Sequence, residues 1–258
     1  MLTFCKLLEL LLLDLDAVRV AEVLAVELLH PRDREPGILV RSATTVRKDV
    51  IDACPDLKFI GRGGVGMDNI DVDYARDQGK VVFNTPAASS QSVAELVMAH
   101  LFAMARSLHK SYAAMPKQGG AEFKALKKAY AKGIELRGKT LGIVGCGPIG
   151  TAVARRAAGF NMRLLAYDPF PNEAAQELGV EFVSLETLLQ QSDYVSLHAA
   201  VTPETEGLIS APQLHLMKPN SYLINAGRGA LVNETDLAAC LNAHGIAGAA
   251  VDTYHVEP

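Results

Sequence analysis

Tryptophan is absent from the 258-residue sequence, and only 6% of its residues are aromatic. The chain is nevertheless 49% hydrophobic, which is enough to fill the core of one large or two ordinary domains. It also lacks an excess of basic residues, since its formal net charge is -4. The overall charge therefore favours neither nucleic acid nor an anionic membrane as a partner, and an anionic ligand must be bound by local groups.

Cysteine is scarce as well. The four cysteines share no C-x-x-C or zinc-type spacing, and a chain of this length needs no disulfide cross-links. We interpret them as reduced thiols of a cytoplasmic protein, and we assign no metal ligands. They are Cys5, Cys54, Cys146 and Cys240.

No uncharged hydrophobic run is long enough to span a membrane. The leucine-rich start is interrupted by Glu9, Asp14 and Asp16, well short of the roughly 18 to 20 residues that a bilayer requires. Only Lys6 could serve as the basic region of a signal peptide. The leucines recur at helical spacing, so residues 1–29 are predicted to form a helix, or a strand and a helix, packed on a core.

Short aliphatic runs alternate with helical patterns along the chain, which predicts a parallel α/β fold. The first third is expected to form a small domain. Its predicted strands are residues 37–42, 57–64 and 80–86, and its predicted helices are residues 45–54 and 71–79. A long helix over residues 89–112 and a Gly- and Lys-rich connector over residues 115–138 are predicted next.

The rest of the chain has the pattern of a doubly wound dinucleotide fold. Six strand candidates are separated mostly by helical stretches, as in a Rossmann sheet. They are residues 140–145, 162–168, 180–183, 193–198, 221–227 and 246–252.

The strongest motif is "LGIVGCGPIG", a G-x-G-x-x-G run that follows the first of these strands and opens a helix. The first glycine permits a tight turn, the second lets the backbone approach a pyrophosphate, and the third lets helix and strand pack closely. Asp168 ends the next strand, where a carboxylate can bind the ribose hydroxyls of NAD and repel the phosphate of NADP. FAD and S-adenosylmethionine bind similar folds, but a FAD fingerprint usually lies near the start of a chain. We therefore expect NAD, bound by Gly145, Gly147, Pro148, Ile149, Gly150 and Asp168.

A second motif, "INAGRGALV", places Arg228 between two glycines just past a predicted strand. Open α/β sheets bind ligands at the carboxyl ends of their strands, and a guanidinium there can bind a carboxylate through two parallel hydrogen bonds. Arg228 is therefore a candidate functional side chain. A third motif, "RGGVGMDNID", contains Gly63, Gly64 and Gly66, which form either an anion-binding loop or a tight turn without a ligand.

Together these segments resemble the D-2-hydroxyacid dehydrogenase family. The resemblance rests on "LRGKTLGIVGCGPIG", "SLHAAVTPETEGLI", "MKPNSYLINAGRGALVNETDL" and "GAAVDTYHVEP", which occur in the family's order. "VRSATTV", "GRGGVGMDNID" and "NTPAASSQSVAELV" are similar to the members that oxidise D-3-phosphoglycerate. The resemblance implies a flavodoxin-like substrate domain over residues 1–84, with an atypical first strand, and a Rossmann NAD-binding domain over residues 85–258. It also implies a homodimer or higher homo-oligomer, formed through the long helix and the connector.

The resemblance further implies a reaction, the NAD-dependent oxidation of D-3-phosphoglycerate to 3-phosphohydroxypyruvate in serine biosynthesis. In the family, the arginine at the position of Arg228 binds the substrate carboxylate, and the glutamate at the position of Glu257 raises the pKa of a catalytic histidine. The implied substrate contacts are Arg41, Arg62, Gly64, Val65 and Gly66. The further implied cofactor contacts are His198, Ala226 and Asp252.

The catalytic histidine is where the sequence departs from the family. In the family it follows the Glu-Pro pair by a few dozen residues in a P-H-x-G-like context, and none of the seven histidines before Pro258 has that context. We therefore expect either a dehydrogenase of which this chain is a part, or a truncated, non-catalytic NAD-binding chain. Among dehydrogenases, a glycerate, glyoxylate or lactate type is the alternative to one specific for 3-phosphoglycerate.

Overall fold

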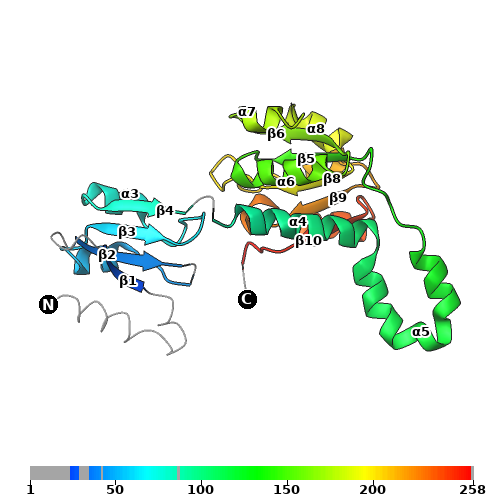
Figure 1. The fold of residues 1–258 in the computed structure, drawn as a ribbon, viewed down its shortest axis with the longest axis horizontal. Helices are drawn as coiled ribbons and strands as arrows, with labels where there is room; N and C mark the ends of the chain where they lie inside the picture. The colour runs from blue at the N-terminus through cyan, green and yellow to red at the C-terminus, as the bar shows by residue number, and fades with distance from the viewer. Residues whose placement is uncertain (1–23, 29–34, 42, 86–87, 257–258) are drawn as a thin grey trace. The chain divides into compact units, whose positions relative to one another are not determined.

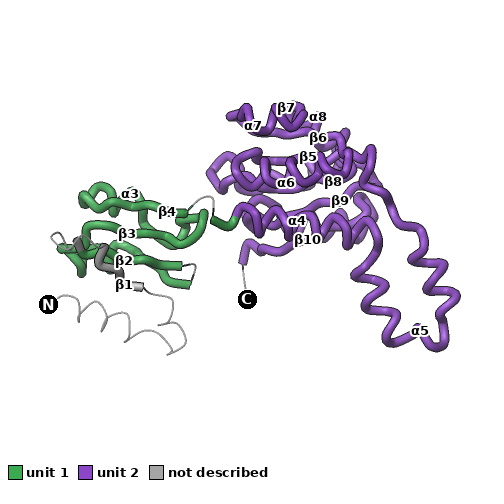
Figure 2. The backbone as a smooth tube through the Cα atoms, in the orientation of Figure 1, with its two compact units in different colours: residues 1–89 green, residues 90–258 purple. Residues whose placement is uncertain are grey.

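The computed structural model describes residues 24–28, 35–41, 43–85 and 88–256. Two compact units are present, residues 1–89 and 90–258 (Figure 2). The sequence predicts a boundary five residues earlier, after residue 84. The helix expected near the start of the chain lies mostly outside the described residues. None of the described helices is long and apolar enough to cross a membrane.

Unit 1 contains a four-stranded sheet with the strand order β1-β2-β3-β4. The strands are β1 (Leu24–Leu28), β2 (Glu35–Val40), β3 (Phe59–Arg62) and β4 (Val81–Asn84), and the helices are α2 (Lys48–Ala53) and α3 (Val72–Asp77). β2, β3 and β4 are parallel, whereas β1 pairs antiparallel with β2 and makes the sheet mixed. The carboxyl ends of β2, β3 and β4 therefore meet at one edge of the sheet.

Unit 2 contains a six-stranded parallel sheet with the order β10-β9-β8-β5-β6-β7. The strands are β5 (Thr140–Val144), β6 (Arg163–Tyr167), β7 (Glu181–Phe182), β8 (Tyr194–Leu197), β9 (Tyr222–Asn225) and β10 (Gly248–Val251). All six predicted strands are present. Because the order reverses direction at β5, the prediction of a doubly wound sheet is confirmed, and a ligand site is expected at the carboxyl ends of β5 and β8.

Helices cover both faces of this sheet (Figure 1). Ile143 packs in the core beneath α4, α6 and α7, while the next residue, Val144, packs in the core beneath α8, α9 and α10. Successive side chains of a strand point to opposite faces, so a strand buried on both faces is apolar at most positions. The helices are α4 (Ser90–Ala105), α6 (Pro148–Ala158), α7 (Glu173–Gln176), α8 (Leu185–Gln191), α9 (Ala211–Leu216) and α10 (Glu234–Asn242).

The prediction of one long helix over residues 89–112 is wrong, because two helices occupy this region. α4 ends at Ala105, and Ser107 has a left-handed backbone conformation (φ 51°), which ends an α-helix. α5 (Leu108–Tyr130) then extends through most of the predicted connector and away from the sheet of unit 2 (Figure 1). It consists of two helical segments that meet at Glu122, where φ is -117°.

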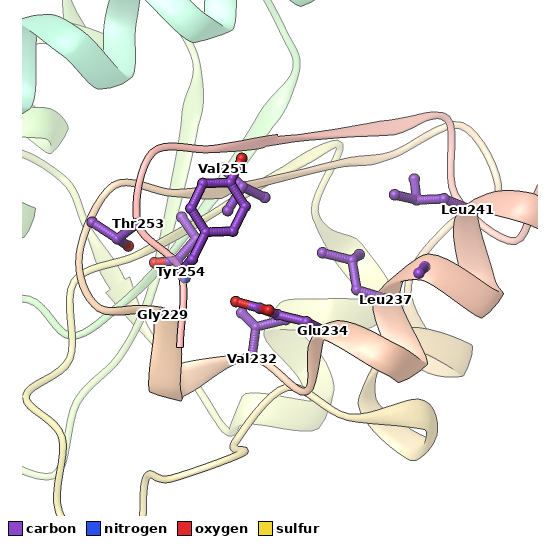
Figure 3. A pocket seen from close by; sticks show the side chains of 10 residues that line it. Gly229, Val232, Glu234, Leu237, Leu241, Val251, Thr253 and Tyr254 are labelled. Carbon is purple, nitrogen blue, oxygen red and sulfur yellow. The ribbon is translucent and has the colours of Figure 1, made fainter. Parts of the chain in front are cut away.

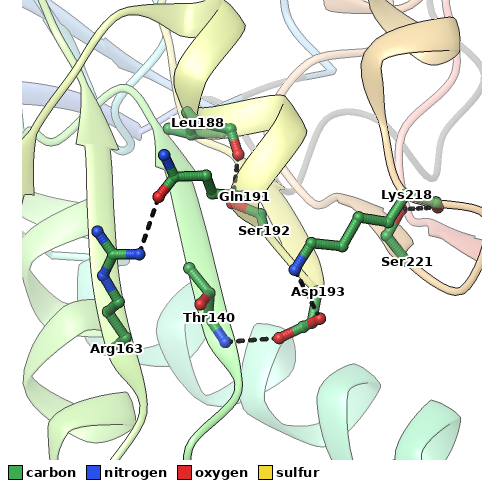
Figure 4. Close-up of polar contacts among 8 residues, drawn as sticks. All are labelled: Thr140, Arg163, Leu188, Gln191, Ser192, Asp193, Lys218 and Ser221. Atoms are coloured by element: carbon green, nitrogen blue, oxygen red, sulfur yellow. Dashed lines mark hydrogen bonds and ion pairs between the residues drawn. The ribbon is translucent and has the colours of Figure 1, made fainter.

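A carboxylate ties together the amino ends of the central strands of unit 2 (Figure 4). Asp193 precedes β8; its Oδ2 accepts a hydrogen bond from the backbone N–H of Thr140 at 2.8 Å, and its Oδ1 accepts one from Lys218 Nζ at 3.0 Å. Burial raises the pKa of Asp193, but these two donors outweigh burial and the pKa is lowered. The charged group thus stabilises the edge of the sheet that lies opposite the expected ligand site.

Candidate functional site

The three glycines of the turn after β5 have different surroundings. Gly145 has a φ of +88°, and a Cβ there would lie 2.4 Å from the backbone nitrogen of Ala199. A Cβ at Gly150 would lie 2.4 Å from the carbonyl oxygen of Gly145, so only glycine lets α6 pack this close to the turn. A Cβ at Gly147 would meet no atom within 4 Å. The space beside Gly147 is therefore open to a ligand at the amino end of α6, where backbone N–H groups and the helix dipole favour an anion.

Asp168 and Asn172 hold this turn against the end of β6. Asp168 accepts hydrogen bonds from the backbone N–H groups of Cys146 at 2.7 Å and Phe170 at 2.8 Å. Asn172 donates to the carbonyl oxygen of Cys146 at 2.5 Å and accepts from the N–H of Ala175, which caps α7. A carboxylate can accept about four hydrogen bonds, so Asp168 keeps capacity for ribose hydroxyls. Asn172 was not predicted, although an Asn at a helix start soon after a strand could have suggested it.

His198 lies at the carboxyl end of β8, next to the turn. Its Nε2 is 2.9 Å from Ser196 Oγ, and its Nδ1 is buried with no hydrogen-bond partner among the described residues. Burial lowers the pKa of His198 to about 4, so the ring is neutral at pH 7. A neutral ring adds a polar group to this edge of the sheet but no positive charge.

Arg228 lies just past the end of β9 in a loop that is closed by Asn225. Asn225 is buried, and its Nδ2 donates to the carbonyl oxygen of Arg228 at 2.9 Å. Arg228 Nη1 donates to the carbonyl oxygen of Gly227 at 2.9 Å. Ala226 is buried, and Asp252 is exposed after β10, where its N–H donates to the carbonyl oxygen of Asn225. All four residues thus lie at the carboxyl edge of the sheet, whereas Glu257 lies outside the described residues.

A cavity of about 160 Å³ lies between α10 and the segment that follows β10 (Figure 3). Leu237 and Leu241 line it from α10, and Thr253 and Tyr254 line it from the opposite side. Neither Arg228 nor any residue of the glycine turn is part of this lining. Because the lining is mostly apolar, the cavity does not suit a nucleotide or a carboxylate.

In unit 1, the predicted residues Arg41 and Arg62 lie beside the glycine loop over residues 63–66. The Arg62 guanidinium donates to the carbonyl oxygen of Gly63 at 2.5 Å, and a Cβ at Gly64 would lie 2.0 Å from its Nη1. Asn69, which was not predicted, accepts from Arg62 Nε at 3.4 Å and donates to the carbonyl oxygen of Arg41 at 2.9 Å. The Arg41 side chain is exposed and passes Gly63, since a Cβ there would lie 3.7 Å from Arg41 Cγ. The carboxyl ends of β2 and β3 therefore carry two cations.

The last residue of β4 and the residue after it hold the backbone of the loop from Gly63 to Gly66. Thr85 Oγ1 accepts a hydrogen bond from the N–H of Gly64 at 2.9 Å, and Asn84 donates to the carbonyl oxygen of Val65 at 2.5 Å. Within the described part of unit 1, no acceptor takes a hydrogen bond from the N–H of Val65 or Gly66. Two neighbouring backbone donors beside cationic side chains can bind an anion.

Comparison with known proteins decides the family. The sequence model of the D-isomer specific 2-hydroxyacid dehydrogenase NAD-binding domain matches residues 98–258. The chain belongs to this family. The open side of the glycine turn and the position of Asp168 fit the cofactor that the family domain binds, NAD.

Several relatives within the 2-hydroxyacid dehydrogenase family are similar over most of this chain. A D-3-phosphoglycerate dehydrogenase of Methanocaldococcus jannaschii is 42% identical over 95% of the chain and 46% of its own length. A hydroxypyruvate reductase of Thermotoga maritima is 42% identical over 86% of the chain and 70% of its own length. A structure of D-lactate dehydrogenase from Aquifex aeolicus complexed with NAD and lactic acid has a TM-score of 0.76 and 32% identity, covering 84% of this chain and 64% of its own. The chain thus spans about half the length of the first of these relatives.

Proposed function

We propose that the chain forms the nucleotide-binding and carboxylate-binding part of an NAD-dependent dehydrogenase of 2-hydroxy acids. The observation that carries this proposal is the position of Arg228, at the carboxyl edge of the same sheet as the glycine turn, with only β8 between β9 and β5. When bound, NAD supplies the hydride acceptor for C2 of the substrate. Arg228 binds the substrate carboxylate through two hydrogen bonds, which orients C2 and the reacting oxygen.

Other residues of unit 2 bind the cofactor and orient the general base. The glycine turn and the amino end of α6 bind the pyrophosphate, and Asp168 binds the ribose hydroxyls. Glu257 orients the general base, as the family resemblance implies. His198 is not that base, because a group with a pKa of about 4 removes a hydroxyl proton poorly at pH 7.

We propose D-3-phosphoglycerate as the substrate, with residues of unit 1 binding its phosphate. Arg41 and Arg62 supply positive charge in a chain whose net charge is -4, and the loop from Gly64 to Gly66 supplies backbone donors for an anion. The name of the M. jannaschii relative agrees with this substrate. The names of the T. maritima and A. aeolicus relatives favour the alternative, an unphosphorylated 2-hydroxy acid.

The role of Arg228 is tested in a chimera in which the carboxyl-terminal segment of the M. jannaschii relative follows Pro258. Arg228→Ala should lower turnover by roughly 100- to 1,000-fold, because an oriented cation at the reacting centre is lost. NADH affinity, followed by fluorescence, should be unchanged. Arg137→Ala is the matched control, since Arg137 is exposed before β5. Equal turnover of the Arg228→Ala and Arg137→Ala variants would refute the assignment.

The substrate is tested by comparing 3-phosphoglycerate with D-glycerate. Arg41→Ala and Arg62→Ala should each lower kcat/KM for the phosphorylated substrate about 10-fold or more, with little effect on glycerate, because only the former carries a phosphate. Arg47→Ala is the control, since Arg47 pairs with Asp71 instead. Equal losses on both substrates would favour the unphosphorylated alternative.

We further propose that two copies pair through α5. Leu126 is the only residue of this helix, among those described, that is buried, while Tyr112 and Phe123 are 83% and 53% exposed. A helix that extends from its unit with exposed aromatic side chains suits an interface between copies. Sedimentation should show about twice the 27.6 kDa chain mass. A Tyr112→Ser, Phe123→Ser double variant should be monomeric, and a parent chain that is itself monomeric would refute the pairing.

A further inference from the structure

Asn225 makes three hydrogen bonds around the loop that carries Arg228. It is the last residue of β9 and is 1% exposed. Its Nδ2 donates to the carbonyl oxygen of Arg228 at 2.9 Å, and its Oδ1 accepts from the N–H of Gly227 at 3.2 Å. Its own carbonyl oxygen accepts from the N–H of Asp252 at 2.9 Å. The buried side chain of Asn225 therefore holds the peptide N–H of Gly227 and the peptide carbonyl of Arg228, one on each side of the Gly227–Arg228 bond.

Only an amide of this length satisfies both partners. The side chain of Asn has two donors and an acceptor, whereas an ionised Asp of the same shape has acceptors alone. The Asn225→Asp change would direct an oxygen at the carbonyl oxygen of Arg228. Asn225→Ala would leave the N–H of Gly227 without its partner, and would leave the carbonyl oxygen of Arg228 with the N–H of Leu231 at 3.2 Å. A buried polar group that loses its partner destabilises the folded state, so the loop would move to recover a partner.

The opposite side of the loop is also restrained. A Cβ at Gly229 would lie 1.9 Å from the carbonyl carbon of Tyr254, so the segment after β10 lies directly on the backbone of Gly229 (Figure 3). Glu234 Oε1 accepts a hydrogen bond from the N–H of His255 at 2.7 Å and holds that segment to the start of α10. Arg228 is thus placed between the end of β9 and a packed segment, and Asn225 supplies the connection to the strand.

We propose that Asn225 is a positioning residue, which holds the backbone of Arg228 so that its guanidinium is oriented for the substrate carboxylate before binding. This proposal rests on the proposed function of Arg228. Orientation that is fixed in advance reduces the entropy lost on binding, and a displacement of about 1 Å can cost roughly 100-fold in activity. Asn172 does the equivalent work for the glycine turn through Cys146, so the two asparagines should affect different ligands.

The test uses the 258-residue chain and two probes, NADH and oxamate, a small unreactive carboxylate. NADH is titrated first, and oxamate is then titrated into the chain saturated with NADH. Asn225→Asp and Asn225→Ala should weaken oxamate binding about 10- to 100-fold and leave NADH affinity within about threefold of the parent. Asn172→Ala should weaken NADH binding and, once NADH is saturating, leave oxamate binding near that of the parent. Thermal melting of each variant checks that it is folded.

A double-mutant cycle separates positioning from a general structural role. If Asn225 acts through Arg228, Asn225→Asp should cause no further loss of oxamate affinity in an Arg228→Ala background. A full further loss in that background, or unchanged oxamate affinity in folded Asn225→Asp, would overturn the positioning role while leaving the proposed function intact. A parent chain that binds NADH but no oxamate would instead refute carboxylate binding by Arg228, and the role of Asn225 with it.

Discussion

Gly147 and Gly150 are three residues apart in one turn, and the absence of a side chain serves a different purpose at each. At Gly150 a Cβ would collide with the carbonyl oxygen of Gly145, so this glycine is needed for folding. At Gly147 a Cβ would meet open space, so this glycine is needed only when a ligand approaches. Sequence spacing alone gives the two the same importance, and the structure separates their roles.

Alanine substitutions at these two residues should therefore affect different properties, ligand binding at Gly147 and stability at Gly150. Gly147→Ala should keep the melting temperature of the parent but weaken NADH binding, because the added methyl group occupies the space next to the amino end of α6. Gly150→Ala should lower the free energy of unfolding by about 1–3 kcal/mol, because the turn or α6 must shift. Thermal melts and NADH titrations of both variants provide the check. A large loss of stability in Gly147→Ala would contradict this division.

The hydroxyl of Tyr194 leads to a second prediction at this scale. The ring of Tyr194 stacks on that of Tyr222 with a centroid distance of 5.4 Å. The Tyr194 hydroxyl is buried without a hydrogen-bond partner among the described residues. Burial raises the pKa of this hydroxyl to about 12. Tyr194→Phe should be as stable as the parent or up to about 1 kcal/mol more stable, because an unpartnered polar group is removed. Tyr194→Ala, the control, should lose about 3–5 kcal/mol. Urea unfolding measures both, and a clear loss in Tyr194→Phe would mean that the hydroxyl has a partner.

At the scale of elements, the sheet of unit 2 is stabilised at one edge and carries its site at the other. Asp193 connects β5, β8 and the turn before β9 at their amino ends, through Thr140 and Lys218. The Gly145 turn, His198 and Arg228 lie at the carboxyl ends of the same strands. Changes at Asp193 should therefore act on stability and not on ligand binding.

Asp193 should make the stability of unit 2 dependent on acid pH. Its folded-state pKa is lowered, so its contribution is complete above the unfolded-state pKa of about 3.9 and is lost as the pH falls through the lower, folded value. Asp193→Asn should cost about 1.5–3 kcal/mol at pH 7, and the difference from the parent should shrink below about pH 4. Urea unfolding from pH 7 to pH 3 measures this difference. A difference that stays constant over this range would refute the explanation, and Lys218→Met should reproduce part of the effect.

At the scale of the whole molecule, the two units have separate cores. Two clusters of buried hydrophobic residues enclose the sheet of unit 2, and a third lies within unit 1. Among the described residues, none of these clusters draws on both units. A unit with its own core can fold alone.

A chain of residues 90–258 should therefore fold and bind NADH with an affinity within about threefold of the full chain. Every described residue of the glycine turn, together with Asp168 and Asn172, lies within it. Oxamate should also bind, whereas 3-phosphoglycerate should lose the contribution of Arg41 and Arg62. Circular dichroism and the NADH titration test this expectation, and an unfolded or non-binding fragment would show that unit 1 is needed.

The sequence by itself determined the parallel α/β class, the six strands of unit 2 and the glycine turn before α6. These depend on local patterns, since continuous apolar runs mark strands buried on both faces and glycine spacing marks a turn at a helix start. The tertiary structure alone decided that β1 is antiparallel, that the long helix breaks at Ser107, and that Asn225, Asn172 and Asn69 hold the loops. An asparagine in a sequence is compatible with a cap, a turn or an exposed surface. The partners of Asn172 and Asn69 lie on distant loops, and only folding brings them within hydrogen-bond distance. The side-chain partners of Asn225 are two and three residues away, but they reach it only in the backbone turn that follows β9.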